Sequence, residues 1–347
     1  MRVATTVEAS QQPWQEIYEF VVEAEHLGLD ICWVAEAWGS DAPSVLGFLA
    51  AWTDRLLLGS GVFQVGIRTP VTIAMTALTL ARISDGRFLL GLGSTGPQVI
   101  EGLHGQSFAS PLTRMRETID VIRQALAGDK IDYSGIQFKI PRPGGHGRPM
   151  RLSLPANSDL PIYIASMSPK MLELTGQEAD GWLGTSFVPE GSGAYFEHLD
   201  AGLAHLGTYP QGSRRLPGCR SRDPPRRRRR RGPRPNTEER TSFQPWRNGI
   251  GGRQLLQQRL QPSRLGRRRP EIRHLWQAGD RDGASALVTD EMVLSTTLIG
   301  TEAMVRERLR VWHDAGVDTV RLYPTGTTTH EKLDTLARAI ELVRTVE

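Results

Sequence analysis

The 347-residue chain contains only two cysteines, Cys32 and Cys219. So few cysteines exclude a disulfide scaffold and any zinc or iron–sulfur site built from cysteine clusters, and they are typical of a reducing compartment. The His-x-Glu and His-Glu-x-x-His patterns are absent, so we expect no metal centre. The G-x-S-x-G nucleophile motif and the phosphate-binding P-loop are absent as well.

Long apolar runs are also missing. Nowhere do about 18 uninterrupted apolar residues occur, and the first eight residues lack the apolar segment of a signal peptide. We therefore expect a cytoplasmic protein without a membrane partner. The length suits one large domain or two ordinary ones, and 39% hydrophobic residues are enough to form a core.

One stretch, 209–273, lacks Ala, Val, Met and Lys altogether. It holds 20 Arg and four acidic residues, a net charge of +16, while the other 282 residues carry −12 and the whole chain +4. Such a basic run can be a solvated linker or a nucleic-acid-binding patch. A frame-shifted translation explains both the excess of Arg and the missing residue types. In a run of Arg codons of the form CGN, reading one base later gives GNC codons, which encode Ala, Asp, Gly or Val. We therefore interpret 209–270 as out of frame, and expect no nucleic-acid partner.

Outside this stretch, short apolar runs alternate with segments of helical period, as in βα units. Residues 131–160 interrupt the alternation with a hairpin signal, and we expect an insertion there over one barrel end. Seven strands are expected outside 209–270, and one more hidden within that stretch gives eight. The sequence therefore predicts an α/β fold, a single (β/α)8 TIM barrel over 1–347 whose site lies at the carboxyl ends of the strands. Expected strands are 2–6, 31–35, 56–63, 88–93, 161–166, 181–186 and 319–323; expected helices are 13–27, 44–53, 70–84, 111–127, 169–177, 195–206, 272–278, 301–315 and 331–346.

Three side chains after the second expected strand are candidates for the site. Glu36 and Asp41 are candidate catalytic acids, although Glu36 can instead pair with a core Arg and Asp41 can cap the next helix. Trp38 is expected to stack on a flat ligand. His104, the only His in an expected mouth loop, is a third candidate acid, with a structural His as the alternative.

Glycines lie at the carboxyl ends of two of the expected strands. The two glycines of Gly59-Ser-Gly61-Val62 permit a bulge beside which a planar ring can stack, and a simple strand end is the alternative. The G-x-G-x-x-G pattern at 91–96 is a poor dinucleotide fingerprint, because three βα units precede it and Pro97 follows. We interpret it as a barrel loop close to a ligand, which includes Ser94 and Thr95.

A fourth candidate segment follows the fifth expected strand. Ser166, Met167, Ser168 and Pro169 lead into a helix, whose first backbone N–H groups can hold a phosphate. An ordinary Ser cap before a Pro at the first helical position is the alternative.

Several of these segments together resemble the luciferase-like monooxygenase superfamily: 35–42, 58–62, 84–93 and 178–182. The resemblance covers 1–206 and 271–347. Segments 94–102 and 111–114 resemble the branch that uses the deazaflavin coenzyme F420. The resemblance implies coenzyme F420 as cofactor, with FMN as the alternative, a ring beside Gly61 and Val62, and a coenzyme phosphate at 166–169.

The implied activity is hydride transfer between reduced deazaflavin and a C=C, C=N or C=O bond of a small molecule. The alternatives are an FMN monooxygenase that uses oxygen and a non-catalytic nucleic-acid-binding protein built on the Arg stretch. Members that dehydrogenate a sugar phosphate carry a His after the second strand and a Glu after the fourth, where this chain has Ala37 and Ser94. The departure argues against sugar dehydrogenation. A homodimer is a further expectation.

Resequencing of the gene tests the frame-shift interpretation. We expect independent reads to restore a frame rich in Ala, Asp, Gly and Val between codons 209 and 270. An unbroken Arg-rich frame in those reads would contradict this interpretation.

Overall fold

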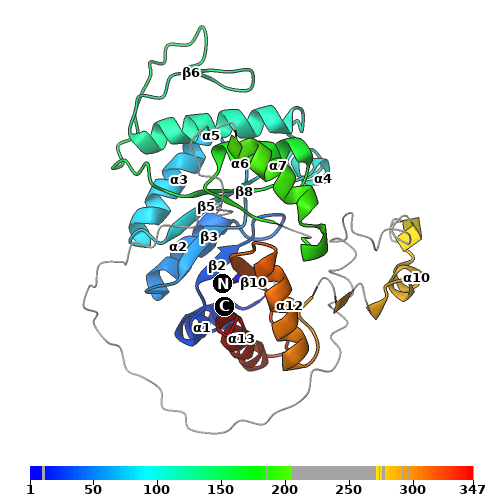
Figure 1. Cartoon of the computed structure of the whole chain (residues 1–347). Helices are drawn as coiled ribbons and strands as arrows, with labels where there is room; N and C mark the ends of the chain where they lie inside the picture. Colours follow the sequence, from blue (N-terminus) through cyan, green and yellow to red (C-terminus); the bar gives the residue numbers. More distant parts are fainter. Residues whose placement is uncertain are drawn as a thin grey trace.

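A computed structural model describes residues 1–9, 12–184, 187–204 and 271–346, apart from 273, 276, 277, 291, 292, 295 and 296. A curled parallel sheet forms the centre, with helices outside it (Figure 1). The strand order is β10-β1-β2-β3-β5-β8-β9, and β4 pairs with β5. The strands are β1 (Arg2–Val7), β2 (Ile31–Val34), β3 (Leu57–Ser60), β4 (Phe63–Gln64), β5 (Phe88–Gly93), β8 (Ile162–Ala165), β9 (Gly181–Trp182) and β10 (Thr319–Leu322).

Helices cover the outside of the sheet, and the short α10 lies apart from it (Figure 1). They are α1 (Trp14–Leu27), α2 (Ala42–Trp52), α3 (Pro70–Ile83), α4 (Pro97–Ile100), α5 (Pro111–Ala127), α6 (Pro169–Glu178), η1 (Pro189–Gly191), α7 (Gly193–Ala204), α10 (Arg281–Ala286), α12 (Glu302–Asp314) and α13 (Thr329–Arg344). The parallel sheet with outer helices confirms the predicted fold class.

The first and last strands are neighbours. β10 pairs in parallel with β1, from Arg2 opposite Thr319 to Thr5 opposite Leu322. β9 and β10 are the two ends of the strand order, and the described part of the chain places no strand between them. The predicted eighth strand belongs to 209–270, which lies outside the described residues.

The strands bury side chains on both faces, as expected for a parallel sheet. Residues such as Val3, Cys32 and Leu90 pack outward against the helices in the main core. A smaller cluster fills the inside of the curled sheet and consists of Ala4, Ile31, Trp33, Leu89 and Tyr163. Alternation along each strand therefore separates an outer core from an inner one.

The insertion expected at 131–160 is present. It contains an antiparallel hairpin of β6 (Tyr133–Ser134) and β7 (Lys139–Ile140). The Glu117 carboxylate of α5 accepts hydrogen bonds from the backbone N–H groups of residues 136–138, at 2.7, 2.8 and 2.9 Å. We expected the insertion over a barrel end, but these bonds attach the hairpin to an outer helix.

Arg87, directly before β5, ties α2 to the start of β3. Its side chain is buried and donates hydrogen bonds to the hydroxyl and carbonyl oxygens of Thr53 and to the carbonyl oxygens of Ala50 and Leu56, all within 3.1 Å. Burial lowers the pKa of the guanidinium. One side chain thus satisfies four acceptors at the end of a helix.

Replacing Arg87 tests this anchor. We expect Arg87→Met to lower the free energy of unfolding by about 3 kcal/mol, because buried acceptors lose their donors. Arg148→Met, at an exposed position in the insertion, is the control. Denaturant unfolding followed by circular dichroism measures both, and equal losses in the two variants would contradict the anchor.

Candidate functional site

The carboxyl ends of the parallel strands lie at one rim of the sheet, and the loops that leave them carry the candidate residues. The loop after β2 is fastened to the end of β1, since the Ser40 hydroxyl donates to the carbonyl oxygen of Ala9 at 2.8 Å. At this rim the loops after β2, β4, β5 and β8 meet.

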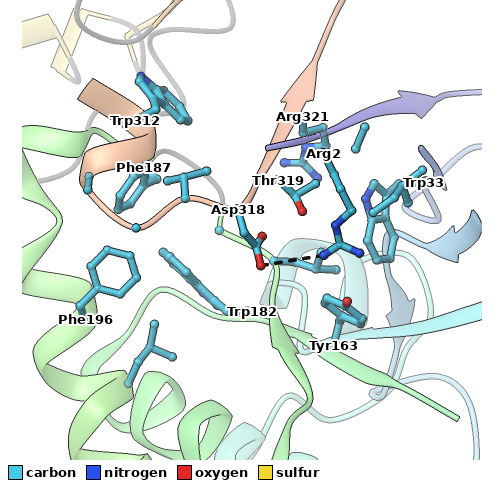
Figure 2. Close-up of a pocket in the computed structure, with 18 of the residues that line it drawn as sticks. Arg2, Trp33, Tyr163, Trp182, Phe187, Phe196, Trp312, Asp318, Thr319 and Arg321 are labelled. Carbon is cyan, nitrogen blue, oxygen red and sulfur yellow. Dashed lines mark ion pairs between the residues drawn. The ribbon is translucent and has the colours of Figure 1, made fainter. Parts of the chain in front are cut away.

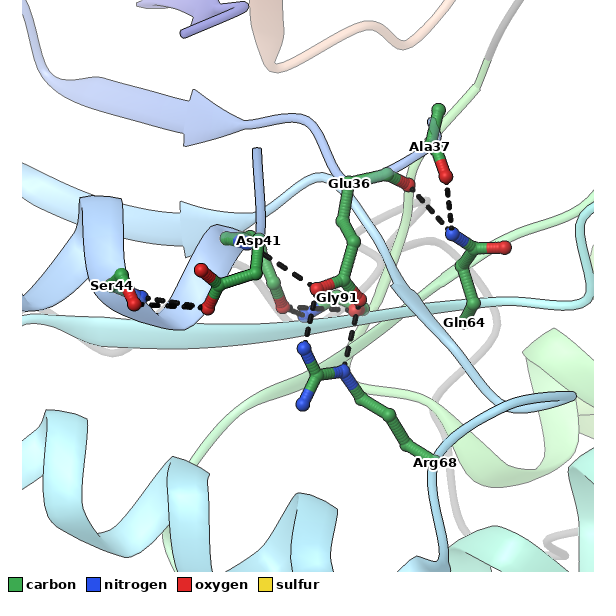
Figure 3. A network of polar contacts seen from close by, with 9 residues as sticks. Glu36, Ala37, Asp41, Ser44, Gln64, Arg68 and Gly91 are labelled. Carbon is green, nitrogen blue, oxygen red and sulfur yellow. Dashed lines mark hydrogen bonds and ion pairs between the residues drawn. The ribbon is translucent and has the colours of Figure 1, made fainter. Parts of the chain in front are cut away.

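The buried carboxylate of Glu36 and the half-buried guanidinium of Arg68 form an ion pair at the rim, which we name the Glu36–Arg68 clamp (Figure 3). The guanidinium donates to both carboxylate oxygens, with Nε 3.0 Å from Oε2. The Ala42 N–H, in the first turn of α2, donates to Oε1 at 3.3 Å. The hydrogen bond with Glu36 raises the pKa of Arg68. The clamp therefore joins the start of α2 to the segment before α3.

Gln64 holds the loop after β2 from the opposite side (Figure 3). Its Nε2 donates to the carbonyl oxygens of Ala37 and Glu36, at 3.0 and 3.3 Å. The side chain is fully buried, and its Oε1 has no hydrogen-bond partner among the described residues. Gln64 thus carries a buried acceptor at the rim that the described protein groups leave unsatisfied.

The predicted bulge follows β3. Gly59 is opposite Leu89 and Phe63 is opposite Leu92, so four steps along one strand face three along β5. This extra residue is a bulge. The Ser60 hydroxyl bridges the interruption, because it donates to the Gly91 carbonyl at 2.9 Å and accepts from the Gly91 N–H at 2.8 Å. The Gly61–Val62 peptide bond is cis.

Glycines near the bulge serve the packing of the protein itself. A Cβ on Gly91 would lie 1.9 Å from the Ser60 carbonyl oxygen, and one on Gly93 would lie 2.3 Å from the Val62 side chain. Both glycines are buried. We expected the glycines of 91–96 to leave space for a ligand, but close approach of the neighbouring strand already explains Gly91 and Gly93.

The three candidate acids are placed differently. Glu36 pairs with Arg68, which corresponds to the alternative given for it, an ion pair with an Arg. Asp41 caps α2, since its carboxylate accepts from the N–H and hydroxyl of Ser44 at 3.1 Å. His104 is exposed in the turn after α4. Their catalytic roles stay predictions, and so does that of Trp38, which is 77% exposed.

In the segment after β8, the first residue is buried and hydrogen-bonded, and the next three are exposed. Ser166 is buried, and its hydroxyl lies 2.8 Å from the Thr175 hydroxyl. Met167, Ser168 and Pro169 are exposed, and Ser168 occupies the N-cap of α6 without a side-chain capping bond. Only the exposed residues and the first amides of α6 can therefore face an anion. Ser94 and Thr95 follow β5, with Thr95 at a φ of 58°.

A cavity of about 200 Å³ opens inside the curled sheet, between β9 and β10 (Figure 2). None of the predicted site residues lines it. Its walls are aromatic, and Arg2 and Asp318 form an ion pair of 3.9 Å at its edge. Because it coincides with the seam where no strand is described, we do not assign it as the binding site. Its aromatic lining comprises Trp33, Tyr163, Trp182, Phe187, Phe196, Trp312 and Tyr323.

Arg68 and Gln64 are the rim residues that sequence reasoning missed. Both follow the third expected strand, so the rule that barrel sites lie after strand ends would have selected them. In the described part of the chain, no three His, Cys, Asp or Glu side chains are grouped to hold a metal ion. No described helix has the length and apolar character needed to cross a membrane.

Comparison with known proteins agrees with this fold. The luciferase-like monooxygenase family model matches residues 1–319. A provisionally named coenzyme F420-dependent oxidoreductase of Mycobacterium tuberculosis is 34% identical over 322 residues, which cover 88% of this chain and 90% of that protein. The 5,10-methylenetetrahydromethanopterin reductase of Archaeoglobus fulgidus is 33% identical over 195 residues, 56% of each chain.

A solved structure supports the same architecture. The coenzyme F420-dependent tetrahydromethanopterin reductase of Methanopyrus kandleri aligns with a TM-score of 0.73 at 19% identity, over 97% of both chains. At this identity the likeness concerns the fold. The match of the family model over most of the chain, together with the mycobacterial relative, shows that the chain belongs to the luciferase-like monooxygenase family.

Proposed function

We propose that the protein is a coenzyme F420-dependent oxidoreductase, which transfers hydride between reduced deazaflavin and a C=C, C=N or C=O bond of a small molecule. The observation that carries this proposal is the 34% identity, over 88% of the chain, to a relative named for coenzyme F420 dependence. The M. kandleri reductase, which shares the fold, is named for the same coenzyme.

The rim has features that suit a flat, polar ring. The bulge at Gly61 and Val62 interrupts the ladder between β3 and β5, and Ser94 and Thr95 follow the neighbouring strand. Gln64, which is fully buried, fixes the loop after β2 at this rim through its amide N–H groups. We therefore infer that the ring binds here, with Trp38 as an aromatic cover.

The coenzyme phosphate is proposed to lie at the start of α6. Met167, Ser168 and Pro169 are exposed there, and Ser168 leaves the first-turn amides without a side-chain cap. Uncapped helix N-termini attract anions through their N–H groups and the helix dipole. Ser166 contributes through its position in the turn, since its hydroxyl is engaged with Thr175.

The coenzyme supplies the hydride chemistry, and the protein supplies orientation and a proton. Glu36 accepts from Arg68 and from the Ala42 N–H, so it acts as a fixed anion that positions the rim. Asp41 is similarly engaged as a cap. Of the three candidates, the exposed His104 is the side chain best suited to deliver a proton near neutral pH.

An anaerobic assay tests the coenzyme. We expect reduced coenzyme F420, mixed with the protein and a panel of enones, imines and ketones, to be reoxidised at a rate proportional to enzyme concentration. Recovery of the absorbance of the oxidised deazaflavin measures this. Copurification of FMN, with no reoxidation by any acceptor, would favour an oxygen-dependent FMN monooxygenase instead.

Replacement of His104 tests the proton donor. General acid catalysis contributes about 10²–10⁴-fold, so we expect His104→Gln to lower kcat at least 100-fold without changing the coenzyme Kd. His146→Gln, at an exposed position in the insertion, is the matched control and should keep full activity. An unchanged kcat in the His104 variant would assign the proton to another donor.

A further inference from the structure

The insertion between α5 and β8 carries positive charge and no negative charge. Residues 133–158, which we name the basic insertion, contain no Asp or Glu. The 282 residues outside 209–273, by contrast, together carry −12. The four Lys and Arg side chains of the basic insertion are all exposed, and none forms an ion pair with another residue of the described chain: Lys139, Arg142, Arg148 and Arg151.

The hairpin of the basic insertion turns one of its two faces outward. Tyr133 and Ile140 are opposite each other in the β6–β7 pair. The Tyr133 hydroxyl donates to the Asp120 carboxylate of α5 at 2.7 Å, so this pair faces the helix. Since side chains alternate along a strand, Lys139 points away from α5 and into solvent. The free face of the hairpin is therefore cationic.

Two large apolar side chains lie among these cations. Ile136, in the turn between β6 and β7, is 82% exposed, and Met150 is 75% exposed. Of the large apolar side chains in the described ranges, only Trp38 at the rim is similarly exposed. A single exposed apolar residue is ordinary, but apolar side chains set among cations are typical of segments that bind a membrane surface.

The position of the basic insertion suits a flat partner. Figure 1 shows it projecting beyond α5, away from the central sheet. The three hydrogen bonds to Glu117 hold the hairpin against the helix in this position. A small ligand requires a concave site, whereas a projecting arm reaches a flat surface before the rest of the protein does.

We propose that the basic insertion binds the surface of an anionic lipid bilayer, with its Lys and Arg side chains at the head groups and Ile136 and Met150 at the acyl boundary. Each cation close to an anionic leaflet strengthens binding about fivefold, so four of them strengthen it several hundredfold. The acidic remainder of the chain is repelled by the same leaflet, which turns the basic insertion toward it.

This binding changes one expectation from the sequence. We expected no membrane partner because the chain lacks long apolar segments. A segment that lies on a membrane does not need them, since charge attraction and a few apolar side chains hold it at the interface. The inference does not depend on the coenzyme, because it concerns a different surface from the rim.

A fluorophore on the hairpin tests the proposal. Ile136→Cys in a Cys219→Ser background places one reactive thiol there, because Cys32 is buried and burial raises its pKa to about 12. An attached nitrobenzoxadiazole should shift its emission to shorter wavelength when vesicles of phosphatidylglycerol and phosphatidylcholine in equal parts are added. Vesicles of phosphatidylcholine alone should leave it unchanged. The label reports contact of the hairpin itself, whatever the Arg-rich stretch binds.

Neutral variants in the same labelled background test the role of charge. We expect the lipid concentration at half-maximal shift to rise at least 100-fold, by the estimate of about fivefold for each cation. The four changes are Lys139→Gln, Arg142→Gln, Arg148→Gln and Arg151→Gln. The matched control keeps the charge at each position: Lys139→Arg, Arg142→Lys, Arg148→Lys and Arg151→Lys.

A second label position controls for unspecific contact. Met304→Cys on α12, where Met304 is 46% exposed, should carry a label that does not respond to either kind of vesicle. An unchanged emission from position 136 with anionic vesicles, or a neutral variant that responds like the charged one, would overturn the proposal. A shift that appears without lipid as the protein concentration rises would assign the hairpin to a contact between copies and overturn it as well.

Discussion

The pairing of β10 with β1 is the constraint on which the rest of the structure depends. It joins residues 319–322 to residues 2–5 and brings the last strand of the chain beside the first. Since all paired strands of this sheet are parallel, their carboxyl ends reach a single rim. Loops that are far apart in the sequence therefore meet there, from the Glu36 loop to the turn at Ser166. The proposed coenzyme site lies at this rim.

Helices and strands whose ends are marked by Pro, Gly or a turn were predicted with nearly the correct bounds. β5 at 88–93 and α5 at 111–127 have the expected bounds, because a turn at Asp85-Gly86 precedes β5, Pro111 begins α5 and Gly128 ends it. The single strand expected at 56–63 is two strands, because the bulge that the two glycines allowed interrupts it at Gly61 and Val62. α4 was missed because four residues are too short to show a helical period.

The sequence predicted which residues lie at the rim better than it predicted which contacts they make. An Arg partner was one of the two alternatives for Glu36, but the sequence does not show which Arg it meets, and Arg68, 32 positions further on, was not chosen. In the sequence, a glycine that makes room for a ligand cannot be told from one that makes room for a neighbouring strand. At Gly91 it is the strand, through Ser60. The sequence also does not show that the Ser166 hydroxyl meets the hydroxyl of Thr175, nine residues further on in α6, and so lies inside the protein.

The Glu36–Arg68 clamp has a mechanical consequence. Glu36 accepts a hydrogen bond from the N–H of Ala42, the first residue of α2, and Arg68 lies just before α3. The starts of both helices are therefore tied to the same ion pair. Because the loop after β2, the start of α2 and the segment before α3 share this one ion pair, loss of either side chain would release all three at once.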